Sequence, residues 1–361
     1  PHFSLSQLTV VPLAVALFAI TACDKNTDSS SSSSSASSVA KPVAINEVRL
    51  TADEAVADAN TIEQQVPIVS APGLATSLWA SEKMLGDTVA IHVDDKGRVW
   101  AGITQRSNNS EFDIRSVPQW EHASMTFDTI NDRKTFLRDE LAIEKSAQNK
   151  TIPDRNHDGN HDWRDLSVMT EKVIRLEDTQ GIGKADFAQT VIDDFHTEVT
   201  DVIGGLFYND LNDELFINIA PDLWRVKDTD GDGYMDSQTS LAHGFGVHIG
   251  FSGHGLSGAT LGPDGMLYYS MGDVGTSITD QYGTRMHYPN QGVIVRSEID
   301  GSNLEVFASG LRNVYEFSFD KYGNFISVDN DGDHIGEYER IVHLIEGSDT
   351  GWRINWQLGK Y

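Results

Sequence analysis

Short apolar stretches that follow acidic or glycine-containing turns recur along the chain. Four such units are VDDKGRVWAGI, YNDLNDELFINI, LGPDGMLYYSMGD and SFDKYGNFISVDN, at residues 93–103, 208–219, 261–273 and 318–330. In each unit the apolar residues alternate with polar ones or run on for the length of one strand, and the turn residues favour a reversal of the chain. The pattern therefore predicts a series of short β-strands joined by tight turns.

These units repeat about every 50 residues. Gly265 and Gly323 occupy equivalent turn positions 58 residues apart, and Asp213 precedes Gly265 by 52 residues. A second repeat has a similar period, because RLEDTQGIGKAD begins at Arg175 and RVKDTDGDGYMD begins 50 residues later, at Arg225. Several short strands in each repeat of this length are typical of the blades of a β-propeller.

We therefore expect an all-β fold, a β-propeller of the six-bladed type. After residue 75, only the segment around 132–146 has the pattern of an amphipathic helix. A period of about 50 residues gives fewer than six blades before Tyr361, and a propeller closes by packing its last blade against its first. We expect the propeller domain to cover residues 73–361 and to be truncated at its C-terminus.

The N-terminal residues have the pattern of a bacterial lipoprotein signal. Leu8–Ile20 is an apolar run of 13 residues, too short to span a bilayer as a mature helix. The small residue Ala22 comes next to the only cysteine of the chain, Cys23. This order predicts a signal peptide over 1–23, cleaved before Cys23, with a lipid attached to the cysteine sulfur. The alternative is an ordinary secretory signal with an incidental cysteine.

Residues 24–72 separate this signal from the strand pattern. Ser29–Ser38 is almost pure serine, a composition that cannot bury a core and behaves as a flexible linker. We expect a tether over 24–72 that joins the folded domain to a membrane in the bacterial periplasm. Because the chain has one cysteine, no internal disulfide can form.

The chain is strongly acidic. It has 27 Lys and Arg residues against 54 Asp and Glu residues, which gives a formal net charge of −27. Such a surface repels phosphate backbones, so the charge argues against a nucleic acid as partner. It attracts cations, although acidity can also serve solubility alone.

Two acidic loops have oxygen-bearing side chains at the spacing that suits a hard cation. Ligands at alternate positions, with a glycine at the sixth position for the sharp turn, are typical of Ca²⁺ loops. The candidate ligands are Asp228, Asp230, Asp232 and Asp236 in DTDGDGYMD, and Asp154, Asn156, Asp158, Asp162 and Asp165 in DRNHDGNHDWRD. Plain turns are the alternative, because Asp-Gly sequences favour turns without a metal.

A third copy of the loop begins at Asp178. It has Gln180 and Ile182 where the other two copies have candidate ligands, and we expect it to bind no metal. A copy without these ligands indicates that the first role of the loop is structural, as a turn between strands.

The unit GHGLSGATLGPDGMLYYSMGDVG, residues 253–275, places a titratable ring and a carboxylate at its two ends. His254 lies between two glycines, and Asp273 follows the predicted strand 19 residues later. A lone histidine among glycines is more often a loop residue than a catalyst, so these residues alone leave both interpretations open.

Three stretches make the chain resemble the glucose/sorbosone dehydrogenase type of quinoprotein propeller. They are the unit at 253–275, SGLRNVYEFSFDKYGN at 309–324 and VDNDGDHIGEYERIVHLIEGSDTGW at 328–352. The chain resembles more closely the large propeller dehydrogenase-like proteins of planctomycete-type bacteria, whose blades carry similar Asp-Gly linkers. The resemblance covers roughly residues 160–356.

The resemblance implies a role for each matching residue. His254 would be catalytic, with Asp273 paired to it. Arg312 and Asn313 would face the quinone cofactor or the reacting centre, and the loop that supplies the cofactor's Ca²⁺ would contain Asn330 and Asp331. Val314 departs from the family pattern, which has proline after Arg-Asn, and the family's Lys and Arg residues that grip the cofactor would lie beyond Tyr361.

The implied activity is oxidation of a sugar or another polyol by hydride transfer to pyrroloquinoline quinone, PQQ, with a cytochrome or a quinone as the next electron acceptor. A neutral imidazole is a suitable base for the hydroxyl proton, and a neighbouring carboxylate fixes its tautomer. An arginine near the quinone would stabilise the negative charge that develops there.

Two other functions are compatible with the same residues. A hydrolytic propeller of the lactonase type would hold a central Ca²⁺ with Glu, Asn and Asp, which Asn313 and Asp331 would fit, and would use a histidine base. A lipid-anchored binding propeller would use its Ca²⁺ loops only to brace the blades.

The lipoprotein signal predicts that Cys23 is necessary for membrane attachment. Replacement of the cysteine (Cys23→Ser) removes the sulfur that carries the lipid, so the protein should move from the membrane pellet to the soluble periplasmic fraction. Fractionation and immunoblotting of both variants measure this. A Cys23→Ser protein that still sediments with membranes would show that the signal is not a lipoprotein signal.

Overall fold

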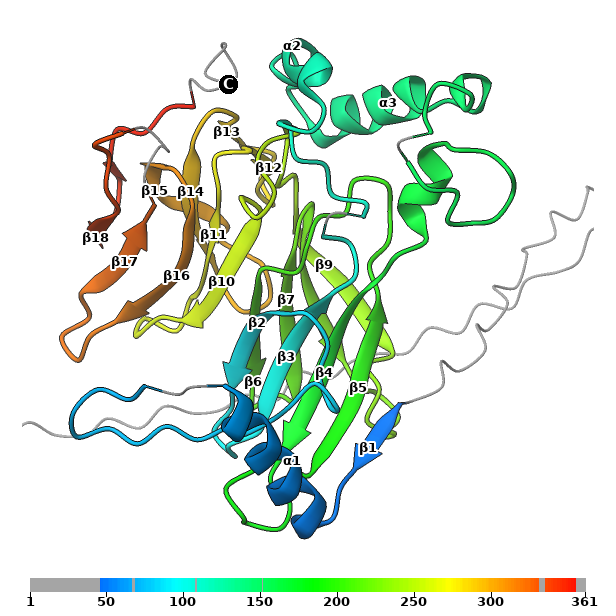
Figure 1. Cartoon of the computed structure of the whole chain (residues 1–361). Helices are drawn as coiled ribbons and strands as arrows, with labels where there is room; N and C mark the ends of the chain where they lie inside the picture. Colours follow the sequence, from blue (N-terminus) through cyan, green and yellow to red (C-terminus); the bar gives the residue numbers. More distant parts are fainter. Residues whose placement is uncertain (1–45, 67–68, 108, 151, 331–334, 355–361) are drawn as a thin grey trace, which may run out of the picture. The chain divides into compact units, whose positions relative to one another are not determined.

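The computed structural model describes residues 46–66, 69–107, 109–150, 152–330 and 335–354, which belong to one unit, Ala44–Tyr361. Cys23 and Asp331 lie outside the described residues. The described part is mainly β, and most of its strands form four small antiparallel sheets that follow one another along the chain (Figure 1).

Each sheet is a meander in which consecutive strands pair. The first contains β2 (Thr88–Val93), β3 (Val99–Thr104), β4 (Glu171–Glu177) and β5 (Phe187–Asp194). The second contains β6 (Gly205–Asn209), β7 (Glu214–Ile219), β8 (Asp222–Lys227) and β9 (Ser237–His243). The third contains β10 (Leu256–Leu261), β11 (Leu267–Met271), β14 (Gly292–Ser297) and β15 (Glu305–Leu311). The fourth contains β16 (Val314–Phe319), β17 (Phe325–Asp329) and β18 (Arg340–Leu344).

Four further strands extend this plan. β1 (Glu47–Arg49) pairs with β5 at the outer edge of the first sheet, and β19 (Ser348–Asp349) runs parallel to β15. β12 (Thr276–Thr279) and β13 (Arg285–Tyr288) form a separate hairpin between β11 and β14.

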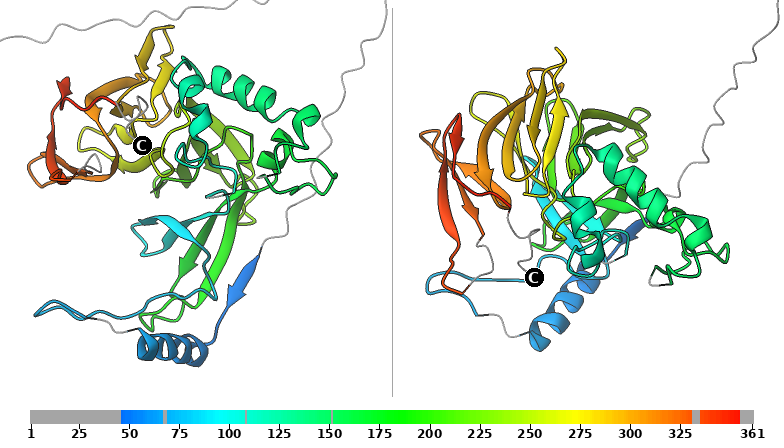
Figure 2. Two further views of the ribbon diagram at one scale, coloured as in Figure 1. Left: turned by 45° about the horizontal axis from the view of Figure 1, so that its top comes forward. Right: turned by 90° about the horizontal axis from the view of Figure 1, so that it is seen from above.

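The sheets are arranged as the blades of a propeller. Their first strands, β2, β6, β10 and β16, contact one another in this order, and Figure 2 shows the succession from two further directions. Aromatic rings pack between neighbouring sheets; Trp100 and Tyr208, for example, stack with their centroids 4.2 Å apart. The prediction of a β-propeller is therefore confirmed. The count of six blades stays a prediction, since the described residues form four blade-like sheets.

The four strand units found in the sequence are the first hairpins of the four sheets: β2–β3, β6–β7, β10–β11 and β16–β17. Each turn has one residue at positive φ, namely Gly97, Asp213, Gly265 or Gly323. Glycine and aspartate are among the residues that tolerate this conformation, so the recurrence of these residues marks the repeat.

The segment predicted as a tether, residues 24–72, contains a strand and a helix in its described part. β1 belongs to the first sheet, and α1 (Ala52–Gln65) starts with a capping box in which Thr51 and Glu54 satisfy each other's backbone amides. This Thr-x-x-Glu signature predicts a helix start, but the acid-rich composition of the segment obscured it. α1 buries only Ala55 and Ala59, so it is a weakly amphipathic surface helix.

An insertion between β3 and β4 contains all the other helices of the described residues. They are η1 (Pro118–Trp120), α2 (Glu121–Ser124), α3 (Ile130–Glu140), η2 (Ile143–Lys145) and η3 (Trp163–Ser167). The helix predicted around 132–146 is α3, which begins and ends earlier than expected. Among the described helices, none is long and apolar enough to cross a membrane.

Arg106 anchors the base of this insertion. Its side chain is fully buried, and the guanidinium donates hydrogen bonds of 2.7–3.1 Å to the carbonyl oxygens of Leu166, Met169, Thr197 and Thr200. One side chain therefore joins both ends of the insertion to the connection between β5 and β6.

Replacement of Arg106 by methionine should destabilise the fold by about 3 kcal/mol or more, because four carbonyl oxygens, of which those of Leu166 and Thr200 are buried, would lose their donor. Urea unfolding of both variants measures this. The matched control Lys145→Met removes an exposed cation and should change stability by less than about 0.5 kcal/mol. Equal unfolding midpoints for Arg106→Met and the native protein would contradict the anchoring role.

Candidate functional site

His254 and Asp273 lie at the same end of the third sheet, since His254 precedes β10 and Asp273 follows its antiparallel partner β11. His254 Nδ1 is 2.7 Å from Asp273 Oδ1. The histidine is 7% exposed and the aspartate 0%. A carboxylate oxygen accepts, so Nδ1 carries the proton and Nε2 of the neutral ring keeps its lone pair.

Asp273 is held by two other parts of the chain. Its Oδ2 accepts a hydrogen bond of 2.9 Å from the Trp352 indole nitrogen, and its backbone amide donates to the Arg312 carbonyl at 2.8 Å. Both carboxylate oxygens are thus hydrogen-bonded, which fixes the orientation of the carboxylate and of the imidazole beside it. Trp352 was not among the predicted site residues, although the Gly351-Trp352 pair ends the third resembling stretch.

Arg312 lies between two aromatic rings beside this pair. Its guanidinium carbon is 5.8 Å from the centroid of Phe251 and 5.6 Å from that of Trp352, and the residue is 2% exposed. Phe251 also meets the His254 ring edge to face, at 5.4 Å. The rings provide cation–π contacts that favour a buried, charged guanidinium.

Asp329, at the end of β17, organises the connection that carries Arg312 and Asn313. Its Oδ1 accepts from the backbone amides of both residues, at 3.0 and 2.8 Å, and its Oδ2 accepts from Arg340 at 2.7 Å. Asp329 is fully buried, so these bonds offset the loss of its hydration. The sequence pointed to the neighbouring residues of this loop, Asn330 and Asp331.

Two predicted cofactor residues have buried acceptors without a partner among the described residues. They are Asn313 Oδ1 and Asn330 Oδ1. A Cβ at Gly272 would lie 3.0 Å from Asn313 Oδ1 and 2.3 Å from the His254 carbonyl oxygen, so only glycine fits there. Buried acceptors are normally satisfied, and these two oxygens would fit a donor group or a cation. Asp331, the last predicted residue of this set, lies outside the described residues.

The first predicted Ca²⁺ loop is the turn between β8 and β9. Carboxylate oxygens of Asp228, Asp230 and Asp232 lie within 4.8 Å of one another. Asp236 does not join this cluster, because its oxygens accept from the amide and hydroxyl of Thr229, at 2.8 and 2.6 Å. The structure thus brings together three of the four predicted ligands.

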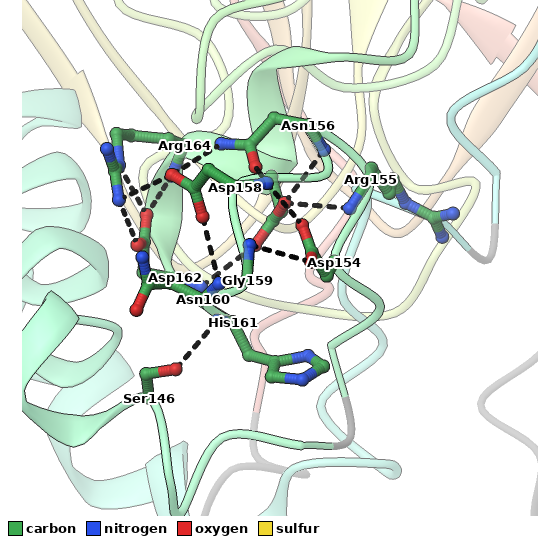
Figure 3. Close-up of polar contacts among 11 residues, drawn as sticks. Ser146, Asp154, Arg155, Asn156, Asp158, Gly159, Asn160, His161, Asp162 and Arg164 are labelled. Carbon is green, nitrogen blue, oxygen red and sulfur yellow. Dashed lines mark hydrogen bonds and ion pairs between the residues drawn. The ribbon is translucent and has the colours of Figure 1, made fainter.

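In the second loop, hydrogen bonds within the loop occupy Asp154 and Asp158 (Figure 3). Asp154 accepts from the amides of Asp158 and Gly159, at 3.1 and 2.9 Å, and Asp158 Oδ2 accepts from the Asn156 amide group at 3.3 Å. These three predicted ligands lie close together, but their bonds are those of a self-contained turn.

The two remaining residues of the second loop serve the start of η3. Asp162 pairs with Arg164 at 2.7 Å and caps η3, and Asp165 accepts from the amides of Arg155, Asn156 and Asp162. Asp162 and Asp165 are both fully buried. Both carboxylates therefore have hydrogen-bond partners at the start of η3, and their role as calcium ligands stays a prediction.

The degenerate loop at 178–186 makes bonds of the same kind as the Asp228 loop at its first and ninth positions. Asp178 accepts from two amides of the loop, and Asp186 accepts from the amide and hydroxyl of Thr179. This loop keeps its shape with Gln and Ile at positions 3 and 5. The first and ninth positions therefore form the turn, whereas acids at positions 3 and 5 are not needed for it.

The model of the family described as Domain of unknown function (DUF7133) matches residues 63–347 of this chain. The chain belongs to the DUF7133 family. Among curated proteins, none matches the sequence. This DUF7133 match covers both the four sheets and the insertion with its helices, so the insertion is part of the family domain.

Solved propeller enzymes are similar to this DUF7133 chain at low identity. The PQQ-bound aldose sugar dehydrogenase from Streptomyces coelicolor is 12% identical, with a TM-score of 0.42, over 74% of this chain and 63% of that one. The PQQ domain of pyranose dehydrogenase from Coprinopsis cinerea is 10% identical, with a TM-score of 0.38, over 73% and 51%. The chain thus spans less than two thirds of these structures, and the likeness concerns the general fold and no functional residue.

Calcium binding at the Asp228 loop stays a prediction. Replacement of Asp230 and Asp232 tests it, since the turn itself does not need these two acids. Added Ca²⁺ should raise the melting temperature of the native protein relative to chelator, and Asp230→Asn with Asp232→Asn should reduce that increase. The control pair Asp139→Asn and Glu144→Gln removes the same charge elsewhere and should keep it. A native protein that melts identically with Ca²⁺ and with chelator would leave the loop as a plain turn.

Proposed function

We propose that this protein oxidises a hydroxyl group of a sugar or another polyol, with His254 as the base that takes the hydroxyl proton. The observation that carries the proposal is the buried His254–Asp273 pair, whose carboxylate is fixed on its other side by Trp352. A structural histidine does not need a buried carboxylate that is itself held by a third side chain. A general base that must keep one orientation and becomes charged during a reaction does need such a carboxylate.

The proton transfer follows from the tautomer. Nδ1 donates to Asp273, so the lone pair on Nε2 is available to accept the proton of a substrate hydroxyl. The imidazolium that forms is stabilised by the adjacent carboxylate at 2.7 Å. Because Trp352 and the Arg312 backbone already hold Asp273, little reorganisation is needed as this charge appears.

Oxidation of the hydroxyl group also removes a hydride from the carbon that carries it, and this hydride needs an acceptor. A PQQ-type quinone, with Ca²⁺ as its cation, supplies that chemistry when bound. Arg312 and Asn313 would hold it, and Asn330 with Asp331 would face its cation. Within the part of the chain that the structure describes, the side-chain oxygens of Asn313 and Asn330 have no partner, and Arg312 is buried. Both observations support this assignment. Asn313 and Arg312 contribute hydrogen bonding and positive charge, respectively.

The same proposal includes location. A lipid on Cys23 would keep the enzyme at a membrane in the bacterial periplasm, where a cytochrome or a membrane quinone could receive the electrons. The sequence pattern at residues 8–23 supports this part of the proposal.

Replacement of His254 by alanine should lower turnover by about 10²–10⁴-fold, the usual contribution of a general base, while PQQ binding persists. Dye reduction with a panel of sugars and polyols, in protein supplied with PQQ and Ca²⁺, measures the rate, and quinone fluorescence measures binding. The exposed His122 provides a matched control, since His122→Ala should keep the native rate.

Native turnover in His254→Ala would refute the role of the histidine. If the native protein oxidises no hydroxyl compound, assays with lactones decide the second candidate, in which the same base would activate water. A protein with neither activity would be a binding propeller, and the dehydrogenase proposal would fail.

A further inference from the structure

The insertion between β3 and β4 lies along the whole segment that leads to His254. Between Gly246 and Gly253, the backbone or side chain of almost every residue contacts the insertion. Val247 and Phe251 pack into its apolar core. The polar contacts are Arg133 to Gly246, Ser124 to His248 and Ile249, Ile114 to Gly250, Asp113 to Ser252 and Glu111 to Gly253.

Glu111 makes the last of these contacts, directly before the histidine. Its Oε1 accepts from the Gly253 amide at 3.0 Å. Its Oε2 is buried and has no hydrogen-bond partner among the described residues. The other polar contacts place the backbone up to Ser252, but Gly253 and Gly255 flank His254, and glycines leave the backbone free. A turn bond from the His254 amide to the Phe251 carbonyl, at 3.3 Å, also spans Gly253. The bond that the Gly253 amide donates to Glu111 therefore adds a contact from the insertion to the backbone directly before the ring.

Glu111 is surrounded by other charged groups. Burial raises the pKa of Glu111 to about 7, and the charges of Asp201 and Glu171 act in the same direction. Arg133 and the Gly253 amide oppose this, but Arg133 is engaged by Asp201 at 2.7 Å. Arg106 and Tyr315 also interact with Glu111 electrostatically.

We propose that Glu111 is a positioning residue of the candidate site, which holds the Gly253 amide and thereby fixes the backbone that presents the His254 ring. Glu111 belongs to the insertion between β3 and β4, and the contacts of the insertion position it beside the Gly253 amide. The inference rests on the proposed function only for its effect on turnover, because the position of the ring can be measured without any reaction.

The protonation of Glu111 gives the inference a direct signature. Its pKa in the folded protein lies above the ordinary 4.5, so the folded state binds more protons than the unfolded state between pH 4.5 and 7. The stability that Glu111 contributes is therefore fully present below pH 4.5 and is lost as the pH rises through 7. Ionisation also strengthens the hydrogen bond that the Gly253 amide donates.

Two substitutions separate the hydrogen bond from the charge. Glu111→Gln keeps an oxygen that can accept from Gly253 but cannot ionise, whereas Glu111→Ala removes both. The control Glu144→Gln changes an exposed glutamate on the same insertion. Thermal melts between pH 5 and pH 8 should show Glu111→Gln gaining stability over the native protein as the pH rises, with no such trend for Glu144→Gln.

NMR of protein labelled with ¹⁵N at glycine and histidine tests the positioning itself. The Gly253 amide signal, assigned by its loss in Gly253→Ala, should titrate near pH 7 in the native protein and not in Glu111→Gln. The His254 ring signals should match the native ones in Glu111→Gln and move in Glu111→Ala. If Glu111→Ala fails to fold, the Gly253 titration in the native protein and Glu111→Gln decides alone.

The rate of turnover provides a second test of the positioning role. In the dye-reduction assay, Glu111→Ala should lose about 10-fold or more in kcat with little change in KM, because a displaced base slows the chemical step rather than binding. Glu111→Gln should keep most of kcat. If the native protein has no activity, the proposed function is refuted, but the NMR test of the Glu111 role remains valid because it needs no reaction. A Gly253 signal that does not titrate, or His254 signals unchanged in Glu111→Ala, would overturn the positioning role.

Discussion

The buried carboxylate of Asp273 is the constraint on which the candidate site depends. A carboxylate removed from water costs several kcal/mol unless hydrogen bonds replace its hydration. Here His254 and Trp352 occupy its two oxygens, and its own amide bonds the Arg312 carbonyl. One charge thus ties the third sheet to the connection before the fourth and to the segment after β19. A neutral residue could fill the same space at a smaller desolvation cost. What the buried carboxylate provides is the fixed orientation of the His254 ring.

The blades and the insertion contribute different things to this site. The meanders bring the starts of β10 and β16 and the ends of β11 and β17 to one side, which places His254, Asp273, Arg312 and Asp329 near one another. The insertion from 105 to 170 supplies the contacts that hold the backbone before the histidine, and Arg106 fixes its base. Regular strands therefore provide proximity, and the irregular insertion provides the alignment of the ring.

Local features of the sequence predicted the hairpins, and the family resemblance implied the His254–Asp273 pair. The turn residues act within each hairpin, and the pair lies on the two ends of a single hairpin, 19 residues apart. Trp352 and Glu111 could not be found in this way, since they reach Asp273 and Gly253 from 79 and 142 residues away. The same holds for β1, whose pairing with β5 depends on a partner about 140 residues later. The start of α1 did have a local signal, the Thr51–Glu54 capping box, which the acid-rich composition of the segment concealed.

The tautomer of His254 tests the central claim most directly, and its measurement needs neither substrate nor cofactor. Long-range ¹H–¹⁵N spectra of histidine-labelled protein, at a pH where the ring is neutral, distinguish a protonated ring nitrogen from one with a free lone pair. The account predicts the proton on Nδ1 and a free lone pair on Nε2, with this preference weakened in Asp273→Asn. A neutral ring protonated on Nε2, or a mixture of both tautomers that Asp273→Asn leaves unchanged, would contradict it.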